Sequence, residues 1–175
     1  MEQQLNYEAL YTSYIEDSME IIRMCGLDKY LPKKKIIFKL NARLKSAIGR
    51  WSWENGQDTI EFSRQYFVEY ANRKMHFEIL NTIVHELCHA MKDGETHGTT
   101  WKRYADVINR KYNLKIKRIA DYDEVIRYFD EIENQKKVVV QCEVCQREYR
   151  MKPTSVRYKK LHNYHCHCGG KLKKI

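Results

Sequence analysis

The sequence predicts an α+β fold with a small cysteine-rich module at its C-terminal end. Segments with helical spacing of apolar residues and segments with β-type patterning occur in blocks, which is typical of α+β rather than βαβ architecture. Four of the six cysteines fall within the last 40 residues. We therefore expect two domains, one over residues 1–135 and a second over residues 136–175.

The first half predicts one helix followed by strands. Apolar residues recur at helical spacing over residues 5–24, and Gly26 supplies a stop. After Pro32, the segment KKKIIFKL has β-type patterning. The next segment, SAIGRWSWENGQDTIEF, predicts two strands joined at Asn55-Gly56, a pair that favours hairpins.

The second half predicts three helices and then short strands. A wide apolar face begins near Met75, and we expect Gly94 to end that helix. Two further helices are expected over Thr99–Tyr112 and Asp121–Glu133. From residue 137 onward, short β-type runs lie between paired cysteines, as in small zinc ribbons.

Length and composition limit the class of protein. Of the 175 residues, 43% are apolar, enough for a core that needs no disulfides. No apolar stretch reaches the roughly 18 residues of a membrane-spanning helix, so we expect no membrane association. The start, MEQQLNYEAL, lacks the pattern of a signal peptide. We therefore expect a cytoplasmic monomer with reduced cysteines, associated with the nucleoid if the host is bacterial.

The charge is distributed unevenly. The net charge is +9, and residues 136–175 hold eleven basic residues against two acidic ones, so residues 1–135 are neutral as a whole. Within them, Leu31–Arg50 contains seven basic residues and no acid. This polarity favours a polyanionic partner, nucleic acid above all. The alternative is a charged surface that only keeps the protein soluble.

Residues 85–89 read His-Glu-Leu-Cys-His, the H-E-x-x-H pattern, within a stretch of helical spacing. Residues four apart lie on one face of a helix, so His85 and His89 can bind one zinc ion. Glu86 can then accept a proton from water at the open side of the metal. Cys88 lies off the histidine face, and we expect it in the core.

A catalytic zinc ion has three protein ligands and an open fourth position. His97, eight residues after His89, is the candidate third ligand, and Asp106 is the less favoured alternative. The spacing differs from the H-E-x-x-H-x-x-G-x-x-H of metzincins, because two extra residues precede the third histidine. His76 has no evident partner, and we assign it to the surface or the core.

Four cysteines in the tail form two close pairs, Cys142 with Cys145 and Cys166 with Cys168. Clustered cysteines without a secretory signal favour a zinc site over disulfides. The second pair has one intervening residue where ribbons have two, so His165 is an alternative ligand to Cys166. We favour four cysteines around a structural zinc ion, because thiolate is the commoner ligand. A module that has lost its zinc is the third alternative.

Basic and aromatic residues are interleaved in the same tail. Cations can follow phosphates and aromatic rings can stack on unpaired bases, so the pattern favours single-stranded DNA without sequence specificity. The alternative is that the tyrosines form the core of the module. The residues concerned are Arg147, Arg150, Lys152, Arg157, Lys159 and Lys160, with Tyr149, Tyr158 and Tyr164.

HELCHA and the THGTTW that follows it resemble motifs of the SprT-like metalloprotease family, which includes Spartan. The segment AIGRWSWENGQDTIEFS resembles the family's strand before the active-site helix, and the paired cysteines resemble its zinc ribbon. The resemblance implies a minimal zincin-like metalloprotease domain. It implies His85, His89 and His97 as zinc ligands, Glu86 as the catalytic residue, and DNA–protein crosslinks as the substrate.

Together these features predict a zinc-dependent endopeptidase, with one catalytic and one structural zinc ion, that cleaves proteins bound or crosslinked to DNA. We expect an extended substrate to pair with the strand near Asp58–Phe62. Two alternatives are a nucleic-acid-binding protein whose zinc sites are purely structural, and a cytosolic peptidase independent of DNA.

Overall fold

In a computed structural model of the chain, residues 6–121 and 123–175 are described, and the chain divides into two compact units, residues 1–121 and 122–175. Each unit combines helices with a small sheet, which confirms the α+β class. The zincin-like assignment stays a prediction. The domain boundary expected between residues 135 and 136 also stays a prediction. The division into compact units falls earlier, between residues 121 and 122, so that the helix α5 (Glu124–Gln135) is grouped with the second unit. No helix in the described part of the chain is long and apolar enough to span a membrane.

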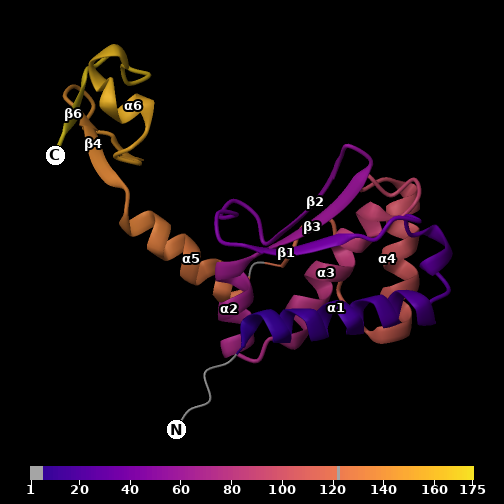
Figure 1. Ribbon diagram of the computed structural model, residues 1–175. Helices are drawn as coiled ribbons and strands as arrows, with labels where there is room; N and C mark the ends of the chain where they lie inside the picture. The colour runs from indigo at the N-terminus through magenta and orange to yellow at the C-terminus, as the bar shows by residue number, and fades with distance from the viewer. Residues whose placement is uncertain (1–5, 122) are drawn as a thin grey trace, which may run out of the picture. The chain divides into compact units, whose positions relative to one another are not determined.

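The described residues of the first unit form four α-helices, a short 3-10 helix and three strands (Figure 1). Three of the α-helices follow the predicted pattern, although residue 5, where the pattern of the first begins, lies outside the described residues. The helix after the third strand is not predicted by the sequence pattern. The elements are α1 (Tyr7–Met24), the 3-10 helix (Asp28–Tyr30), β1 (Ile37–Asn41), β2 (Gly49–Glu54), β3 (Gln57–Ser63), α2 (Arg64–Asn72), α3 (His76–Ala90) and α4 (Thr99–Tyr112).

The sheet of the first unit has the order β1-β3-β2, with β3 parallel to β1 and antiparallel to β2. The predicted hairpin is confirmed, because Asn55 and Gly56 join β2 to β3 with φ of 53° and 74°. Both edges of β3 are therefore occupied. The expectation that a substrate pairs with Asp58–Phe62 is wrong for this reason, and the open edges belong to β1 and β2.

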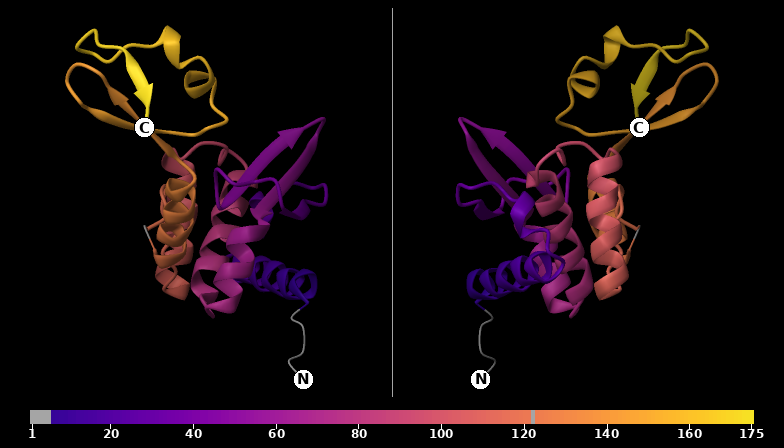
Figure 2. Two further views of the ribbon diagram at one scale, coloured as in Figure 1. Left: turned by 90° about the vertical axis from the view of Figure 1, so that its left-hand side faces the viewer. Right: turned by 90° about the vertical axis from the view of Figure 1, so that its right-hand side faces the viewer.

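The helices α1, α2 and α3 pack against one face of this sheet, and α4 packs against α1 and α3. Figure 2 shows the sheet along one side of the helices from two directions. Apolar and aromatic side chains from both layers fill the space between them, as the alternation of β3 and the wide apolar face of α3 require. Completely or almost completely buried are Ile22, Ile60, Phe62, Phe67, Tyr70, Ile79, Ile83, Leu87, Trp101, Tyr104 and Ile108.

The second unit begins with α5, capped by the Asp123 side chain, which accepts hydrogen bonds from the backbone N–H groups of residues 125 and 126. The predicted start of this helix at residue 121 includes residue 122, which lies outside the described residues. A three-stranded antiparallel sheet follows, in the order β5-β4-β6, around a small core of Val140, Met151 and Leu161. Its elements are β4 (Val138–Cys142), β5 (Glu148–Met151), α6 (Val156–Lys159), a 3-10 helix (Leu161–Asn163) and β6 (Leu172–Lys174).

Candidate active site

Three histidine side chains converge in the first unit. His85 and His89 lie one turn apart on α3, and His97 lies in the loop between α3 and α4. The Nε2 atom of His89 lies 3.3 Å from Nε2 of His85 and 3.1 Å from Nε2 of His97. The Nε2 atoms of His85 and His97 are also 3.1 Å apart. Two nitrogen ligands of a tetrahedral zinc ion lie about 3.3–3.4 Å apart. The group can therefore hold a metal ion.

The outer nitrogens of two of these rings fix the direction of the inner ones. His85 Nδ1 donates to the backbone carbonyl of Lys117 at 2.9 Å, and His89 Nδ1 donates to that of Gly94 at 3.0 Å. A carbonyl only accepts, so the Nε2 atoms of both neutral rings carry lone pairs that face each other. Burial, with the neighbouring histidines, lowers the pKa of His85 to about 4, which keeps it neutral. Lone pairs that face each other at this distance repel unless a cation lies between them. The three histidines therefore fit a shared metal ion.

Two tryptophans enclose the three histidines. The buried Trp101 ring on α4 lies with its centroid 4.8 Å from that of His85, 5.7 Å from His89 and 4.7 Å from His97. The Trp51 ring on β2 stacks on His89 at 6.1 Å. The aromatic packing restricts the rotamers of the histidines, so the site is formed before any ligand binds.

Glu86 directly follows His85 on α3 and is buried. Burial raises the pKa of Glu86 to about 7, and a hydrogen bond from the backbone of Trp51 opposes that rise. The strand β2 approaches α3 very closely here, because a Cβ on Gly49 would lie 2.9 Å from Glu86 Oε1. A glycine at this position therefore allows the sheet to hold the carboxylate in place.

Gly94 lies in the loop that carries His97, and the conformation of this loop requires a glycine there. The predicted end of the helix at Gly94 is wrong, since α3 ends at Ala90. A Cβ on Gly94 would lie 2.0 Å from the Cys88 carbonyl oxygen, so only glycine permits this approach, which places the Gly94 carbonyl at His89. The Cys88 side chain is buried in the core, as predicted, and burial raises the pKa of its thiol.

The structure leaves Asp106, the alternative third ligand, outside the histidine group, and His76 lies outside it as expected. The group that could hold a metal consists of His85, His89 and His97, without Asp106. His76, at the start of α3, is hydrogen-bonded through Nδ1 to the hydroxyl of Tyr14 on α1. His76 therefore joins two helices rather than the metal group.

The segment after α4 orients His85, and nothing in the sequence motif indicates it. Asn109 donates to the Ile116 carbonyl at 3.0 Å and accepts from the Ile116 backbone N–H at 2.9 Å. Asn81 on α3 accepts from the Lys115 backbone N–H. These bonds hold the Lys117 carbonyl at His85 Nδ1. The only signal in the sequence is two asparagines at helical positions, which by themselves are not diagnostic.

A pocket of about 580 Å³ opens beside His89. Its wall combines aromatic rings of Tyr30, Trp51 and Trp53 with polar groups. Among these is Asp58 on β3, which is 7% exposed and accepts a hydrogen bond from Trp51 Nε1 at 2.9 Å. The remaining lining residues are Leu31, Pro32, Lys33, Ala90, Met91, Lys92 and Glu95.

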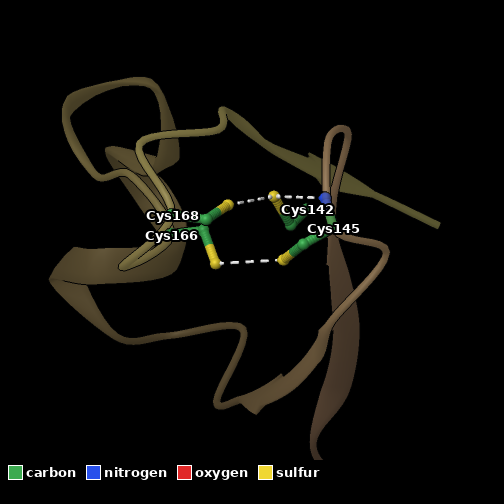
Figure 3. A group of neighbouring side chains, drawn as sticks. All are labelled: Cys142, Cys145, Cys166 and Cys168. Atoms are coloured by element: carbon green, nitrogen blue, oxygen red, sulfur yellow. Dashed lines mark hydrogen bonds between the residues drawn. The ribbon is translucent and has the colours of Figure 1, made fainter.

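The four tail cysteines also converge, as Figure 3 shows. Cys142 Sγ lies 3.5 Å from Cys168 Sγ, and Cys145 Sγ lies 3.5 Å from Cys166 Sγ. These distances exclude disulfides and are near the roughly 3.7 Å between two thiolates of a tetrahedral zinc ion. The group includes Cys166 and not the alternative ligand His165.

Hydrogen bonds around Cys166 favour its thiolate form. The backbone N–H of Cys168 and the Tyr149 hydroxyl, 2.9 Å from Cys166 Sγ, lower the pKa of the Cys166 thiol to about 5. Thiolate is the form that binds zinc. Gly170 permits this packing, because a Cβ there would lie 2.6 Å from Cys142 Sγ.

The tyrosines of the tail have different environments. Tyr149 and Tyr158 pack against the small core of the second unit, which confirms the structural alternative for these two. Tyr164 is half-buried, and the Arg157 guanidinium lies 5.2 Å from its ring centroid. Tyr158 also has a cation over its ring, since Lys174 Nζ lies 4.4 Å from the centroid, but Tyr158 belongs to the core. Tyr164 is the ring outside that core, and together with Arg157 it offers the arrangement of a stacking platform with an adjacent cation.

Comparison with protein-family models identifies a match over the first unit. The model of the SprT-like family matches residues 19–120, which include the sheet, the helices α2 to α4 and all three histidines. No curated protein matches the chain. The paired cysteines lie outside the matched range. Since the match covers more than half of the chain and contains the metal-binding geometry described above, the chain belongs to the SprT-like family.

Proposed function

We propose that the protein is a zinc-dependent endopeptidase that acts on proteins associated with or crosslinked to DNA. The observation that carries the catalytic part is the convergence of three imidazoles, with a buried carboxylate on the residue that directly follows His85. A closed structural metal site has no use for such a carboxylate, whereas hydrolysis of a peptide needs a general base. The SprT-like family is associated with metalloprotease-like domains.

His85, His89 and His97 would hold the ion, and Glu86 would perform the proton transfer. When bound, zinc supplies a Lewis acid that polarises the scissile carbonyl and acidifies water. Glu86 accepts the proton of the attacking water at its carboxylate and passes it to the leaving amine. The Lys117 and Gly94 carbonyls keep the imidazoles of His85 and His89 in the ligating tautomer.

An extended substrate would bind along the open edge of β2. The backbone N–H of Trp51 bonds to Glu86 and not to β3, so Trp51 is an outward-facing position of the ladder. The backbone N–H and C=O groups of successive residues point to opposite edges of a strand, so those of Trp53 point to the same open edge as those of Trp51. Because the Trp51 ring on β2 stacks on His89, a substrate strand paired with this edge would pass close to that histidine.

The tail would recruit the enzyme to single-stranded DNA without sequence specificity. Arg157 and Tyr164 are the strongest candidates for contact with phosphate and base. Binding through several cations implies an affinity that falls steeply with salt. Substrate choice then follows from proximity on DNA, in addition to any pocket beside the metal.

Autocleavage tests this function. The zinc-loaded full chain is incubated with and without single-stranded DNA, and with a protein crosslinked to an oligonucleotide, with Glu86→Gln as the control. Cleavage that requires both DNA and Glu86 is the expected result. Cleavage that requires Glu86 but not DNA favours a DNA-independent peptidase, and DNA binding without any cleavage favours a nucleic-acid-binding protein with structural zinc.

Deletion of residues 137–175 tests the recruitment separately. We expect salt-sensitive DNA binding to be lost, with Arg157→Gln weakening it. Retention of full DNA affinity in the shortened chain would place the binding surface elsewhere.

A further inference from the structure

A buried carboxylate that the proposed mechanism does not use lines the same pocket as His89. Asp58 is 7% exposed, and in the described part of the chain its carboxylate has one side-chain partner, the indole N–H of Trp51. A carboxylate can accept about four hydrogen bonds. A charge that is buried with one neutral donor is costly, so Asp58 is poised for a cationic partner.

Three aromatic side chains line the pocket together with Asp58. Trp53 lies directly opposite Asp58 in the hairpin register, and Trp51 is its neighbour on the same face of β2. Both rings line the pocket with Tyr30, and the pocket extends to His89. Aromatic faces attract lysine and arginine side chains and also contact their methylene groups.

The other charged residues that line the pocket do not supply Asp58 with a cationic partner. Lys33 and Lys92 line it, but both are exposed, and in the described part of the chain neither forms an ion pair with Asp58. Glu95 adds a second, exposed carboxylate. The one buried carboxylate among the lining residues is thus Asp58, and three aromatic side chains line the pocket with it.

We propose that this pocket, lined by Asp58, Trp51, Trp53 and Tyr30, binds a lysine or arginine side chain of the substrate near the scissile bond. The inference rests on the proposed peptidase function and names the class of side chain that it selects. Asp58 is the specificity-determining residue, and the two tryptophans contact the apolar part of the bound side chain. Such a preference directs cleavage to basic segments, which are abundant in proteins that bind nucleic acid.

Paired peptides that differ only in lysine or norleucine at positions flanking the cleavage site test the pocket. We expect the wild type to cleave the lysine peptide with a kcat/KM at least about tenfold higher. Asp58→Asn keeps the acceptor for Trp51 and should bring this ratio close to one. Glu54→Gln, which removes an exposed acid of the same hairpin outside the pocket, should leave the ratio unchanged. An equal rate on both peptides in the wild type overturns the proposal.

Peptide binding to the Glu86→Gln protein gives a readout independent of hydrolysis. Trp51 and Trp53 line the pocket, so their fluorescence reports its occupation. We expect the lysine peptide to bind about tenfold more tightly than the norleucine peptide. Asp58→Asn should abolish this difference in affinity, and Trp53→Ala should reduce it. Trp53 is 62% exposed, so its ring is not needed for folding. If the wild type cleaves no peptide, the peptidase proposal fails while this preference still supports the pocket. Equal binding of both peptides refutes the pocket alone.

Discussion

The strand β2 approaches the helix that carries the histidines very closely at Gly49, where β2 begins. A Cβ there would lie 2.7 Å from Thr82 Cγ2 and 2.9 Å from Glu86 Oε1. Gly49→Ala must therefore displace the strand or the carboxylate. We expect peptidase activity to fall by about two orders of magnitude at unchanged zinc content, because the histidines are held by other contacts. Activity and bound zinc measured on the same samples check this.

Gly98→Ala is the matched control for that substitution. A Cβ on Gly98 would contact only Thr96 Oγ1, at an ordinary 3.4 Å, and its φ of −76° suits alanine. Gly98→Ala should keep its activity. If Gly49→Ala were equally active, the approach of β2 would not position Glu86.

Trp101 packs against all three histidines and is 2% exposed. Trp101→Ala removes this packing and leaves a cavity, so we expect the free energy of unfolding of the metal-free first unit to fall by about 3–5 kcal/mol. Trp53→Ala, with its ring in solvent, should change that free energy by less than about 0.5 kcal/mol. Urea denaturation in the presence of a chelator measures both. Equal effects of the two substitutions would contradict the role of Trp101.

Among the elements, the segment after α4 controls the metal group from outside the motif. Asn109→Ala removes both hydrogen bonds to Ile116 and releases the Lys117 carbonyl from His85. We expect zinc affinity to fall by about tenfold, measured by competition with a chelator. Lys117→Ala keeps the carbonyl and loses only an exposed ion pair with Asp121, so its zinc affinity should stay unchanged. Loss of zinc in the second variant alone would assign the effect to the side chain.

The sequence predicts the elements whose signals are local. Asn55-Gly56 adopts the left-handed conformations that its hairpin requires, and the apolar face of α3 places His85 and His89 on one side. The central position of β3 was missed, because its parallel pairing with β1 joins segments about 20 residues apart and depends on tertiary packing. The hydrogen bond from His85 to Lys117 is equally non-local, since it spans 32 residues.

Over the whole molecule, the two units depend on metal to different degrees. The first unit has an extensive core of its own, whereas the small sheet of the second unit packs around one cluster of three buried apolar residues, Val140, Met151 and Leu161. Burial on this scale cannot offset the entropy of ordering the chain, so zinc at the four cysteines would supply the folding free energy. We therefore expect a chelator to unfold the cysteine module, residues 136–175, while the first unit keeps its helices. Limited proteolysis of the chelated protein measures which of the two parts becomes accessible.

Zinc stoichiometry tests whether the two groups bind independently. The reduced full chain should hold two zinc ions, because both groups have the spacing of tetrahedral ligands. Cys142→Ser should remove one ion and unfold only the module, and His89→Ala should remove the other and leave the module folded. Elemental analysis of the purified variants gives both numbers. A single ion per chain that is insensitive to Cys142→Ser would refute the ribbon site, since a tetrahedral thiolate site that lacks one ligand cannot retain its affinity.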